Sequence, residues 1–367
     1  MEQLERLMVK SVERGASDLH LSAGHPPFIR SHGELERIEG EAALSESELE
    51  TFARGLMNAR QWQAFAEKNT IDLARSSLSG ARFRINVYQQ HTGIAISMRR
   101  IEAEIQDLDF WNLPQALGRL SQYRDGLVIV TGPTGSGKST TLASLLSRIT
   151  QQRSCHVITV EDPIEYVHRS HLALVHQREL HTDVQSFAQA VRSAMREDPD
   201  VLLIGEMRDL ETMRAAITAA ETGHLVFSTL HTGDAVGAID RLVGMFPSTE
   251  QDSIRHQLSM VLRAVVAQRL LPRTDGLGRL PAVELLAVNT AVAHLVRSGR
   301  SDQIYSLMEA GASSGMRTME QDLARLTARR LVPEEEARKS ARNASVFEDW
   351  LRSERGGYQE EGMARPW

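Results

Sequence analysis

The stretch "GLVIVTGPTGSGKST", residues 126–140, runs from an apolar segment through a glycine-rich turn into a basic and hydroxyl pair. From Gly132 to Ser139 the spacing is G-x-x-x-x-G-K-[ST], and a strand-like run before it and a helix-like run after it supply the context that the motif requires. Glycines let successive backbone N–H groups turn inward around phosphates, and a helix beginning near Lys138 adds its positive amino end. The stretch predicts an ATP-binding phosphate loop. Its expected nucleotide-binding residues are Pro133, Thr134, Gly135, Ser136, Gly137, Lys138, Ser139 and Thr140.

Strand-like and helix-like runs alternate after this loop. The strand-like runs are "HVITVEDP" (156–163), "DVLLIGE" (200–206) and "HLVFSTLHT" (224–232), and the helix-like runs between them are "FAQAVRSAMRED" (187–198) and "ETMRAAITAAET" (211–222). Repeated alternation of this kind predicts an α/β fold with a parallel sheet covered on both faces. Apolar residues from Ile254 to Val265, at helical spacing, predict a further helix over 253–271.

The first part of the chain has a different pattern and predicts a separate domain. Residues 1–105 read as a mixed α/β domain with an amphipathic first helix, a hairpin at "FIRSHGELERI" and alternating strands at "ARFRINVYQQ" and "GIAISMRRI". A second helix should begin at the capping pattern of Ser45 and Glu48. We expect an interdomain linker over 106–120, an ATPase domain with a helical C-terminal part over 121–350, and a disordered tail over 351–367.

Carboxylates stand where strands of the predicted sheet end. Glu161 and Asp162 close one strand and Glu206 closes another, and the carboxyl ends of parallel strands form the ligand edge of such sheets. Hydrolysis needs a group that positions or deprotonates water, and Glu206 suits that role. We expect Mg²⁺ to be held directly by Ser139 and through water by Glu161, because Mg²⁺ retains several waters. Lys138 should reach the β and γ phosphates.

Histidines and arginines supply further candidates. His231 follows a strand and could sense the γ phosphate. His224 precedes the same strand, and for this residue a structural role is an equal alternative to a functional one. Arg84 and Arg99 fall on adjacent predicted strands of the N-terminal domain, and spacing alone is also compatible with a solvated face. An arginine supplied by a neighbouring subunit would make hydrolysis depend on assembly.

Composition limits the classes of function. The chain has 367 residues, a net charge of −6 and 5% aromatic residues, which argues against a nucleic-acid-binding surface. No apolar run reaches the length of a membrane-spanning helix and no secretory signal is recognisable, so we expect a cytoplasmic protein without a transmembrane segment. Its single cysteine, Cys155, excludes a four-cysteine zinc module.

Several blocks in order resemble one known family. The blocks "ASDLHLSAGHPP", "ARFRINVY", "GPTGSGKSTTLA", "VEDPIEYVH", "REDPDVLLIGEMRDLETM" and "AAETGHLVFSTLHT" are similar to those of the type IV pilus retraction ATPases (the PilT/PilU family) of the secretion ATPase superfamily. This resemblance covers the chain from about Gly15 to about Ala344. It implies a smaller PAS-like N-terminal domain and a RecA-like ATPase domain.

The resemblance also implies partners and residue roles. It implies a homo-hexamer on the cytoplasmic side of the inner membrane, in contact with a pilus platform protein there, with a related retraction ATPase as a further partner. It assigns Glu161 and Asp162 to an aspartate box, Glu206 to the catalytic position, and His224 and His231 to a histidine box. Arg84 and Arg99 match the family's arginines near nucleotide across the interface between domains or subunits.

Three alternatives to the main retraction motor remain open in the sequence. The stretch "AVAHLVRS", residues 291–298, keeps Leu295, Val296 and Arg297 of the family motif "AIRNLIRE" but departs at Ala293, His294 and Ser298, so an accessory PilU-like motor is one alternative. A nucleic-acid-stimulated RecA-like motor is a second, against which the acidic charge argues. A scaffold that binds ATP without hydrolysis is a third, against which the combination of Lys138, Ser139 and Glu206 argues.

Overall fold

The computed structural model describes residues 1–31, 33–101 and 104–363 of the chain. These residues form two compact units. The first unit comprises Met1–Ile105 together with the segments Val160–Val167 and Gln177–Phe187. The second comprises Gln106–Thr159, His168–His176 and the chain from Ala188 onward.

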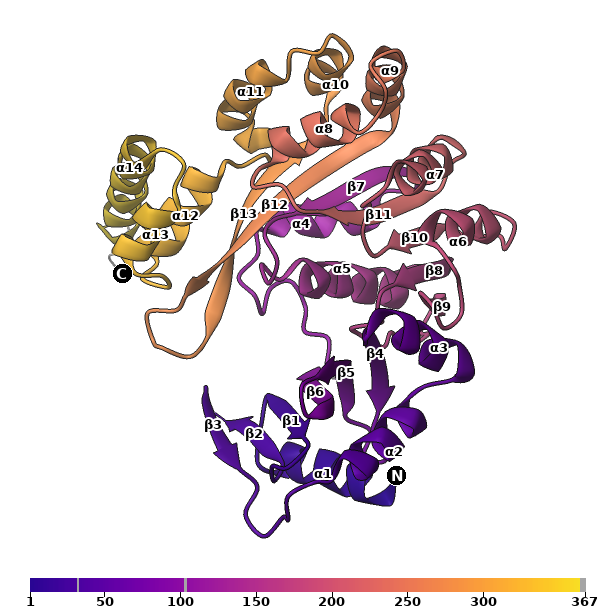
Figure 1. The fold of residues 1–367 in the computed structure, drawn as a ribbon. Helices are drawn as coiled ribbons and strands as arrows, with labels where there is room; N and C mark the ends of the chain where they lie inside the picture. The colour runs from indigo at the N-terminus through magenta and orange to yellow at the C-terminus, as the bar shows by residue number, and fades with distance from the viewer. Residues whose placement is uncertain (32, 102–103, 364–367) are drawn as a thin grey trace. The chain divides into compact units, whose positions relative to one another are not determined.

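The first unit is built on a six-stranded sheet with the order β3-β2-β1-β6-β5-β4 (Figure 1). Its neighbouring strands pair antiparallel throughout. The elements are α1 (Glu2–Glu13), β1 (Asp18–Ser22), β2 (Phe28–Ser31), β3 (Glu34–Arg37), α2 (Glu46–Leu56), α3 (Ala59–Lys68), β4 (Thr70–Ser76), β5 (Arg82–Gln90) and β6 (Gly93–Ile101). The predicted smaller α+β domain is thereby confirmed, with α3 and β4 as elements that the sequence pattern did not indicate.

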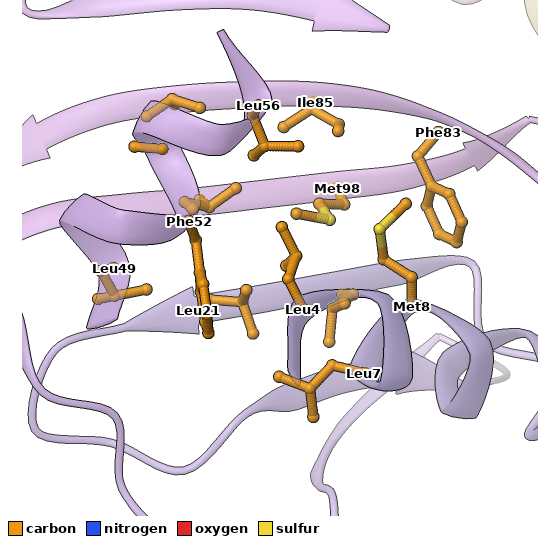
Figure 2. Close-up of a cluster of buried hydrophobic side chains, with 14 of the residues drawn as sticks. Leu4, Leu7, Met8, Leu21, Leu49, Phe52, Leu56, Phe83, Ile85 and Met98 are labelled. Atoms are coloured by element: carbon orange, nitrogen blue, oxygen red, sulfur yellow. The ribbon is translucent and has the colours of Figure 1, made fainter. Parts of the chain in front are cut away.

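Helices α1 and α2 cover the sheet of this unit and contribute to its core. Helix α2 begins at Ser45, whose side chain accepts from the N–H of Glu48 while the Glu48 carboxylate accepts from the N–H of Ser45, as the capping pattern predicts. Apolar side chains of α1 and α2 pack together with inward-facing residues of the sheet strands (Figure 2). The labelled members are Leu4, Leu7, Met8, Leu21, Leu49, Phe52, Leu56, Phe83, Ile85 and Met98. The alternating pattern of β5 therefore has its physical basis in this one-sided burial.

The second unit contains most of a seven-stranded sheet with the order β13-β12-β7-β11-β10-β8-β9, and only the last residues of β8 and β9 are grouped with the first unit. Its strands are β7 (Gly126–Thr131), β8 (His156–Glu161), β9 (Leu174–Glu179), β10 (Val201–Ile204), β11 (Leu225–Leu230), β12 (Leu262–Pro272) and β13 (Arg279–Ala287). Its α-helices are α4 (Gln115–Gly118), α5 (Lys138–Gln152), α6 (Phe187–Ala194), α7 (Leu210–Glu221), α8 (Ala235–Gly244), α9 (Gln251–Val261), α10 (Thr290–Arg297), α11 (Ile304–Ala310), α12 (Met319–Ala328), α13 (Glu334–Ser340) and α14 (Ala344–Met363). Short 3₁₀ turns lie at Arg119–Gln122, Ser301–Gln303 and Ala312–Ser314.

The order of the strands explains the long apolar runs in the sequence. Strands β10, β11, β7 and β12 are parallel neighbours, and every residue of β7, β10 and β11 is buried. Helix α5 lies on one face of the sheet, and α7 and α8 lie on the other (Figure 1). Strands covered on both faces need apolar side chains on both, which gives continuous rather than alternating runs. The predicted α/β fold is confirmed.

The structure differs from two expectations about the second unit. The predicted helix over 253–271 ends at Val261, and the chain continues as strand β12, which pairs antiparallel with β13 at the edge of the sheet. The predicted linker over 106–120 contains Leu108, Leu113 and Leu117, which are buried in the core of this unit. The acidic and aromatic residues of this segment obscured the spacing of its buried leucines in the sequence.

The predicted disordered tail over 351–367 differs from the structure, which assigns a helix to most of it. Helix α14 extends to Met363, and Phe347 and Leu351 are buried on it against a cluster that includes α12. Spacing of three and four residues among Phe347, Trp350 and Leu351 is the helical signal for this segment. Residues 364–367 lie outside the described part of the chain. Among the helices that the structure describes, none is long and apolar enough to cross a membrane.

Candidate nucleotide site

The phosphate loop lies between the end of β7 at Thr131 and the start of α5 at Lys138. Gly135 and Gly137 have φ values of +77° and +85°, in the left-handed region that favours glycine. A Cβ atom at Gly132 would lie 2.3 Å from the backbone oxygen of Gln268, and one at Gly137 would lie 2.8 Å from the Gln268 side-chain nitrogen. The glycine spacing of the motif is thus required both by backbone conformation and by a close approach to β12.

Polar groups of the loop are arranged to meet an anion. Lys138 is 8% exposed, and its Nζ donates to the carbonyl oxygens of Gly132 at 2.9 Å and Pro133 at 3.0 Å, so the amine lies across the loop. The Oγ of Ser136 is buried and has no hydrogen-bond partner among the residues that the structure describes. Exposed Ser139 stands in the first turn of α5, where unpaired backbone N–H groups and the helix dipole favour negative charge. These groups fit nucleotide phosphates.

A cavity of about 460 Å³ opens beside the tip of the loop. Its lining residues are Pro133, Thr134, Gly135, Ser136, His231, Thr232, Gly233, Arg269, Leu270, Arg279 and Ser340. Sequence reasoning missed Arg269 and Arg279, which bring two positive side chains from β12 and β13. Arg269 is held in place by donation from its Nη1 to the carbonyl oxygen of Ser340 at 2.6 Å. The cavity combines backbone donors with cationic walls, as an anionic ligand requires.

Glu206 and His231 meet at the carboxyl edge of the sheet. The Nε2 of His231 lies 3.2 Å from Oε2 of Glu206, and the Nε of Arg208 lies 2.6 Å from the same oxygen. The Glu206 side chain is 13% exposed. Because His231 also lines the cavity, the structure brings Glu206 to the edge of the nucleotide site. Arg208 was not among the expected site residues.

Threonines fix the ends of the strands that carry these groups. The Thr131 hydroxyl at the end of β7 accepts from the N–H of Thr232 at 2.8 Å, and the Thr229 hydroxyl donates to the carbonyl oxygen of Gly205 at 2.6 Å. The first hydrogen bond joins the start of the phosphate loop to the segment after β11. The second joins β11 itself to Gly205, the residue before Glu206. The segment that carries Glu206 and the phosphate loop are thereby held together at one edge of the sheet.

Glu161 ends β8, as expected, and its environment is polar. The Oε1 of Glu161 accepts from the side chain of Gln177 at 3.1 Å, and its backbone oxygen accepts from the N–H of Leu180 at 2.8 Å. Glu161 and Asp162 fall in the first compact unit, whereas Ser139 falls in the second. Hydroxyl and carboxylate oxygens are the donor type that Mg²⁺ prefers, so the residues fit that ion chemically.

His224 does not join His231. His224 precedes β11 and His231 follows it, so the whole strand separates them, about 20 Å at the usual rise per residue. The Nδ1 of His224 lies 2.9 Å from the carbonyl oxygen of Ala219 and 3.1 Å from the hydroxyl of Thr222. Those contacts give His224 a place at the junction of α7 and β11, at the edge opposite the nucleotide cavity.

Arg84 and Arg99 are directly opposite one another on β5 and β6. Arg84 pairs with Glu165 at 3.2 Å, and the Nε of Arg99 donates to Asp18 at 2.9 Å. Their side chains are 43% and 73% exposed, so both remain accessible. The first unit therefore presents two neighbouring cations on one face of its sheet, as the sequence predicts.

Comparison with known proteins places this geometry in a family. Residues 3–284 match the family described as type II/IV secretion system protein. The chain belongs to that family. PilT of Pseudomonas aeruginosa, named a type IV pilus retraction ATPase, is 43% identical over 94% of this chain and 99% of its own length. PilU of the same organism, named a type IV pilus ATPase, is 36% identical over 94% of this chain and 90% of its own length.

A solved structure agrees with the fold of this secretion ATPase. The crystal structure of the pilus retraction motor PilT with bound ADP superimposes with a TM-score of 0.87 at 41% identity, over 94% of this chain and 98% of the other. The protein is therefore a PilT-like ATPase that binds nucleotide. The α/β fold with an antiparallel N-terminal sheet and a mixed C-terminal sheet is the fold that the resemblance implied.

Proposed function

We propose that this secretion ATPase is the subunit of a hexameric motor that hydrolyses ATP to drive retraction of a type IV pilus. The observation that carries the proposal is the match to PilT over 99% of PilT's own length, so no domain of that motor lacks a counterpart here. The TM-score of 0.87 to the PilT motor structure supports the same conclusion. In this proposal the ring works on the cytoplasmic side of the inner membrane against a pilus platform protein, with a related retraction ATPase as a further partner.

In this proposal, each residue of the nucleotide site has a separate role in hydrolysis. Lys138 and the N–H groups of residues 133–140 bind the phosphates, Ser139 would hold Mg²⁺ directly and Glu161 would hold it through water. Mg²⁺, when bound, neutralises charge that develops on the phosphate oxygens. Glu206 orients and deprotonates the attacking water, since its carboxylate lies at the edge of the cavity with one oxygen fixed by His231 and Arg208.

Arg84 and Arg99 complete the site from a neighbouring subunit in this proposal. Both are accessible cations on adjacent strands, and a guanidinium is suited to the charge of a transferring phosphoryl group. Release of their present carboxylate partners, Glu165 and Asp18, would accompany nucleotide engagement. Domain rotation around each nucleotide site then couples hydrolysis to movement of the pilus machinery.

An accessory motor is the second candidate, and helix α10 is the observation that favours it. In the segment 291–298, Val296 matches the family motif and is buried, whereas His294 and Ser298 depart from it and are exposed. The departures therefore alter the surface of α10 and leave its packing intact. Identities of 43% to PilT and 36% to PilU do not separate the two types.

Complementation tests the function directly. The wild-type chain and a Lys138→Ala control are expressed in a strain that lacks its main retraction ATPase, and twitching motility is scored beside the ATPase activity of the purified proteins. We expect twitching and ATPase activity with the wild type and neither with the control. ATPase activity without twitching would support the accessory motor instead.

A surface variant of α10 then separates the two motors. The triple variant Ala293→Arg, His294→Asn and Ser298→Glu restores the family motif at the three positions that depart from it. Under the accessory alternative it gains twitching while its ATPase rate stays unchanged. Under the main-motor proposal the wild type already supports twitching, and the triple variant adds little. Single-stranded DNA should leave the ATPase rate unchanged in both proteins.

A further inference from the structure

Gln268 is a buried amide at the back of the phosphate loop. It lies on β12, is 2% exposed, and uses both ends of its side chain: Nε2 donates to the carbonyl oxygen of Ser136 at 2.7 Å, and Oε1 accepts from the hydroxyl of Thr141 at 2.7 Å. The Ser136 carbonyl can only accept, so it fixes which end of the amide faces the loop. The Gln268 side chain therefore has one orientation that satisfies every group it contacts.

The backbone that carries Gln268 is held on both sides. Strand β12 pairs in parallel with β7, where Ala267 is opposite Thr131, and antiparallel with β13, where Gln268 is opposite Val283. The loop also packs against Gln268 at both ends, because Gly132 approaches its backbone oxygen and Gly137 approaches its side-chain nitrogen too closely for a Cβ atom. The amide thus projects from a strand that is hydrogen-bonded on both sides onto the glycine-rich part of the phosphate loop.

Peptide geometry connects this contact to phosphate binding. In a trans peptide the carbonyl oxygen and the following N–H point in opposite directions. Gln268 draws the Ser136 carbonyl toward β12, so the N–H of Gly137 points away from β12. Gly137 immediately precedes α5, and its N–H is one of the donors that a phosphate loop offers to its ligand.

We propose that Gln268 is a positioning residue for the nucleotide phosphates. Its amide holds the Ser136–Gly137 peptide in the orientation that presents the Gly137 N–H to the ligand, and the Thr141 hydroxyl anchors the oxygen end of the amide. Gln268 does not itself touch nucleotide. The inference rests on nucleotide binding at the phosphate loop and is independent of what the motor drives.

The test is ADP affinity, measured by titration calorimetry on the full chain. Gln268→Met keeps the length of the side chain and removes both hydrogen bonds, and we expect the Kd for ADP to rise about tenfold. Thr141→Val removes only the hydroxyl that anchors the oxygen end of the amide, so a rise of about threefold in the Kd is expected, and Thr141→Ser should match the wild type. The KM for ATP should rise with the Kd while kcat falls less.

A second buried glutamine supplies the matched control. Gln61 in α3 is 9% exposed and caps its own helix, so Gln61→Met should lower the melting temperature without changing the ADP Kd. Wild-type ADP affinity in Gln268→Met would overturn the proposal, as would an equal loss of affinity in Gln61→Met. If Gln268→Met does not fold, Gln268→Asn, whose amide is one methylene short of Ser136, carries the same expectation. Absence of ADP binding by the wild type would remove the site and the proposal with it.

Discussion

The Nε2 of His231 lies 3.2 Å from Oε2 of Glu206, although the two residues follow different strands of the sheet. His231 also lines the cavity beside the phosphate loop. One imidazole thus contacts the proposed water-activating carboxylate and faces the space that nucleotide would occupy. A ligand that enters the cavity and moves the His231 side chain would therefore also change the contact of His231 with Glu206. Through this one side chain, Glu206 can respond to the presence of the γ phosphate.

Removal of the Glu206 charge should separate binding from turnover. Glu206→Gln keeps the shape of the side chain but is a poor base, so we expect ATPase activity to fall at least about 100-fold while the Kd for ADP stays within about twofold. Glu211→Gln, on an exposed glutamate of α7, is the control and should keep full activity. Wild-type hydrolysis by Glu206→Gln would exclude Glu206 as the water activator.

The two histidines that flank β11 should behave differently. His231→Ala removes the contact with Glu206, and we expect turnover to fall about tenfold with little change in ADP affinity. His224→Ala removes the contacts with Ala219 and Thr222, so it should lower the free energy of unfolding by about 1 kcal/mol and leave turnover near wild type. Steady-state ATPase assays and urea unfolding measure both effects. Equal losses of turnover in the two variants would contradict the separation seen along the strand.

Local signals in the sequence were sufficient to place the phosphate loop between a strand and a helix and Glu206 at the end of a strand. The loop conformation depends on glycines within a short segment, and Glu206 follows an apolar run whose end marks the sheet edge. Both predictions need only the neighbouring residues and the rule that parallel strands end at one edge. The capping box at Ser45 is a third signal of this local kind.

Gln268 and Arg269 could not be found by the same reasoning. The apolar spacing of α9 continues past Val261, so the helix pattern masked the start of β12, and residues assigned to a helix were not placed beside the loop. Contact between Gln268 and Ser136 joins positions 132 residues apart, which only the pairing of β12 with β7 determines. A short apolar run is ambiguous between helix and strand by periodicity alone.

The arginines of the first unit test the role of assembly. Arg84→Ala should lower the ATPase rate of the assembled ring about tenfold or more, because it removes a cation proposed to reach the neighbouring nucleotide, and Arg99→Ala should act in the same direction. Arg54→Ala is the control, since Arg54 forms an exposed pair with Glu50 within α2. Size-exclusion chromatography coupled to light scattering checks that each variant still assembles. If the assembled Arg84→Ala variant keeps the wild-type ATPase rate, Arg84 has no part in hydrolysis and only pairs with Glu165.

Glu284 on β13 makes stability depend on pH in a direction that can be tested. It is fully buried, its Oε1 accepts from the N–H of Ala235 at 2.7 Å, and burial raises its pKa from 4.5 to about 7. Between those two values the folded chain binds more protons at this position than the unfolded chain, so this contribution to stability is lost as pH rises toward 7. Burial lowers the pKa of His168 to about 4, which acts in the opposite direction but is present in any Glu284 variant.

Glu284→Gln isolates that contribution, because the amide oxygen can still accept from Ala235 and carries no ionisable proton. We expect the stability of the variant relative to wild type to improve by on the order of 2 kcal/mol between pH 5 and pH 8. Urea unfolding at a series of pH values, without nucleotide, measures the difference. A constant difference across that range would show that Glu284 does not titrate there. Since Ala235 begins α8 three residues after Thr232, which lines the nucleotide cavity, the same series with ADP present would show whether this buried acid also affects the nucleotide site.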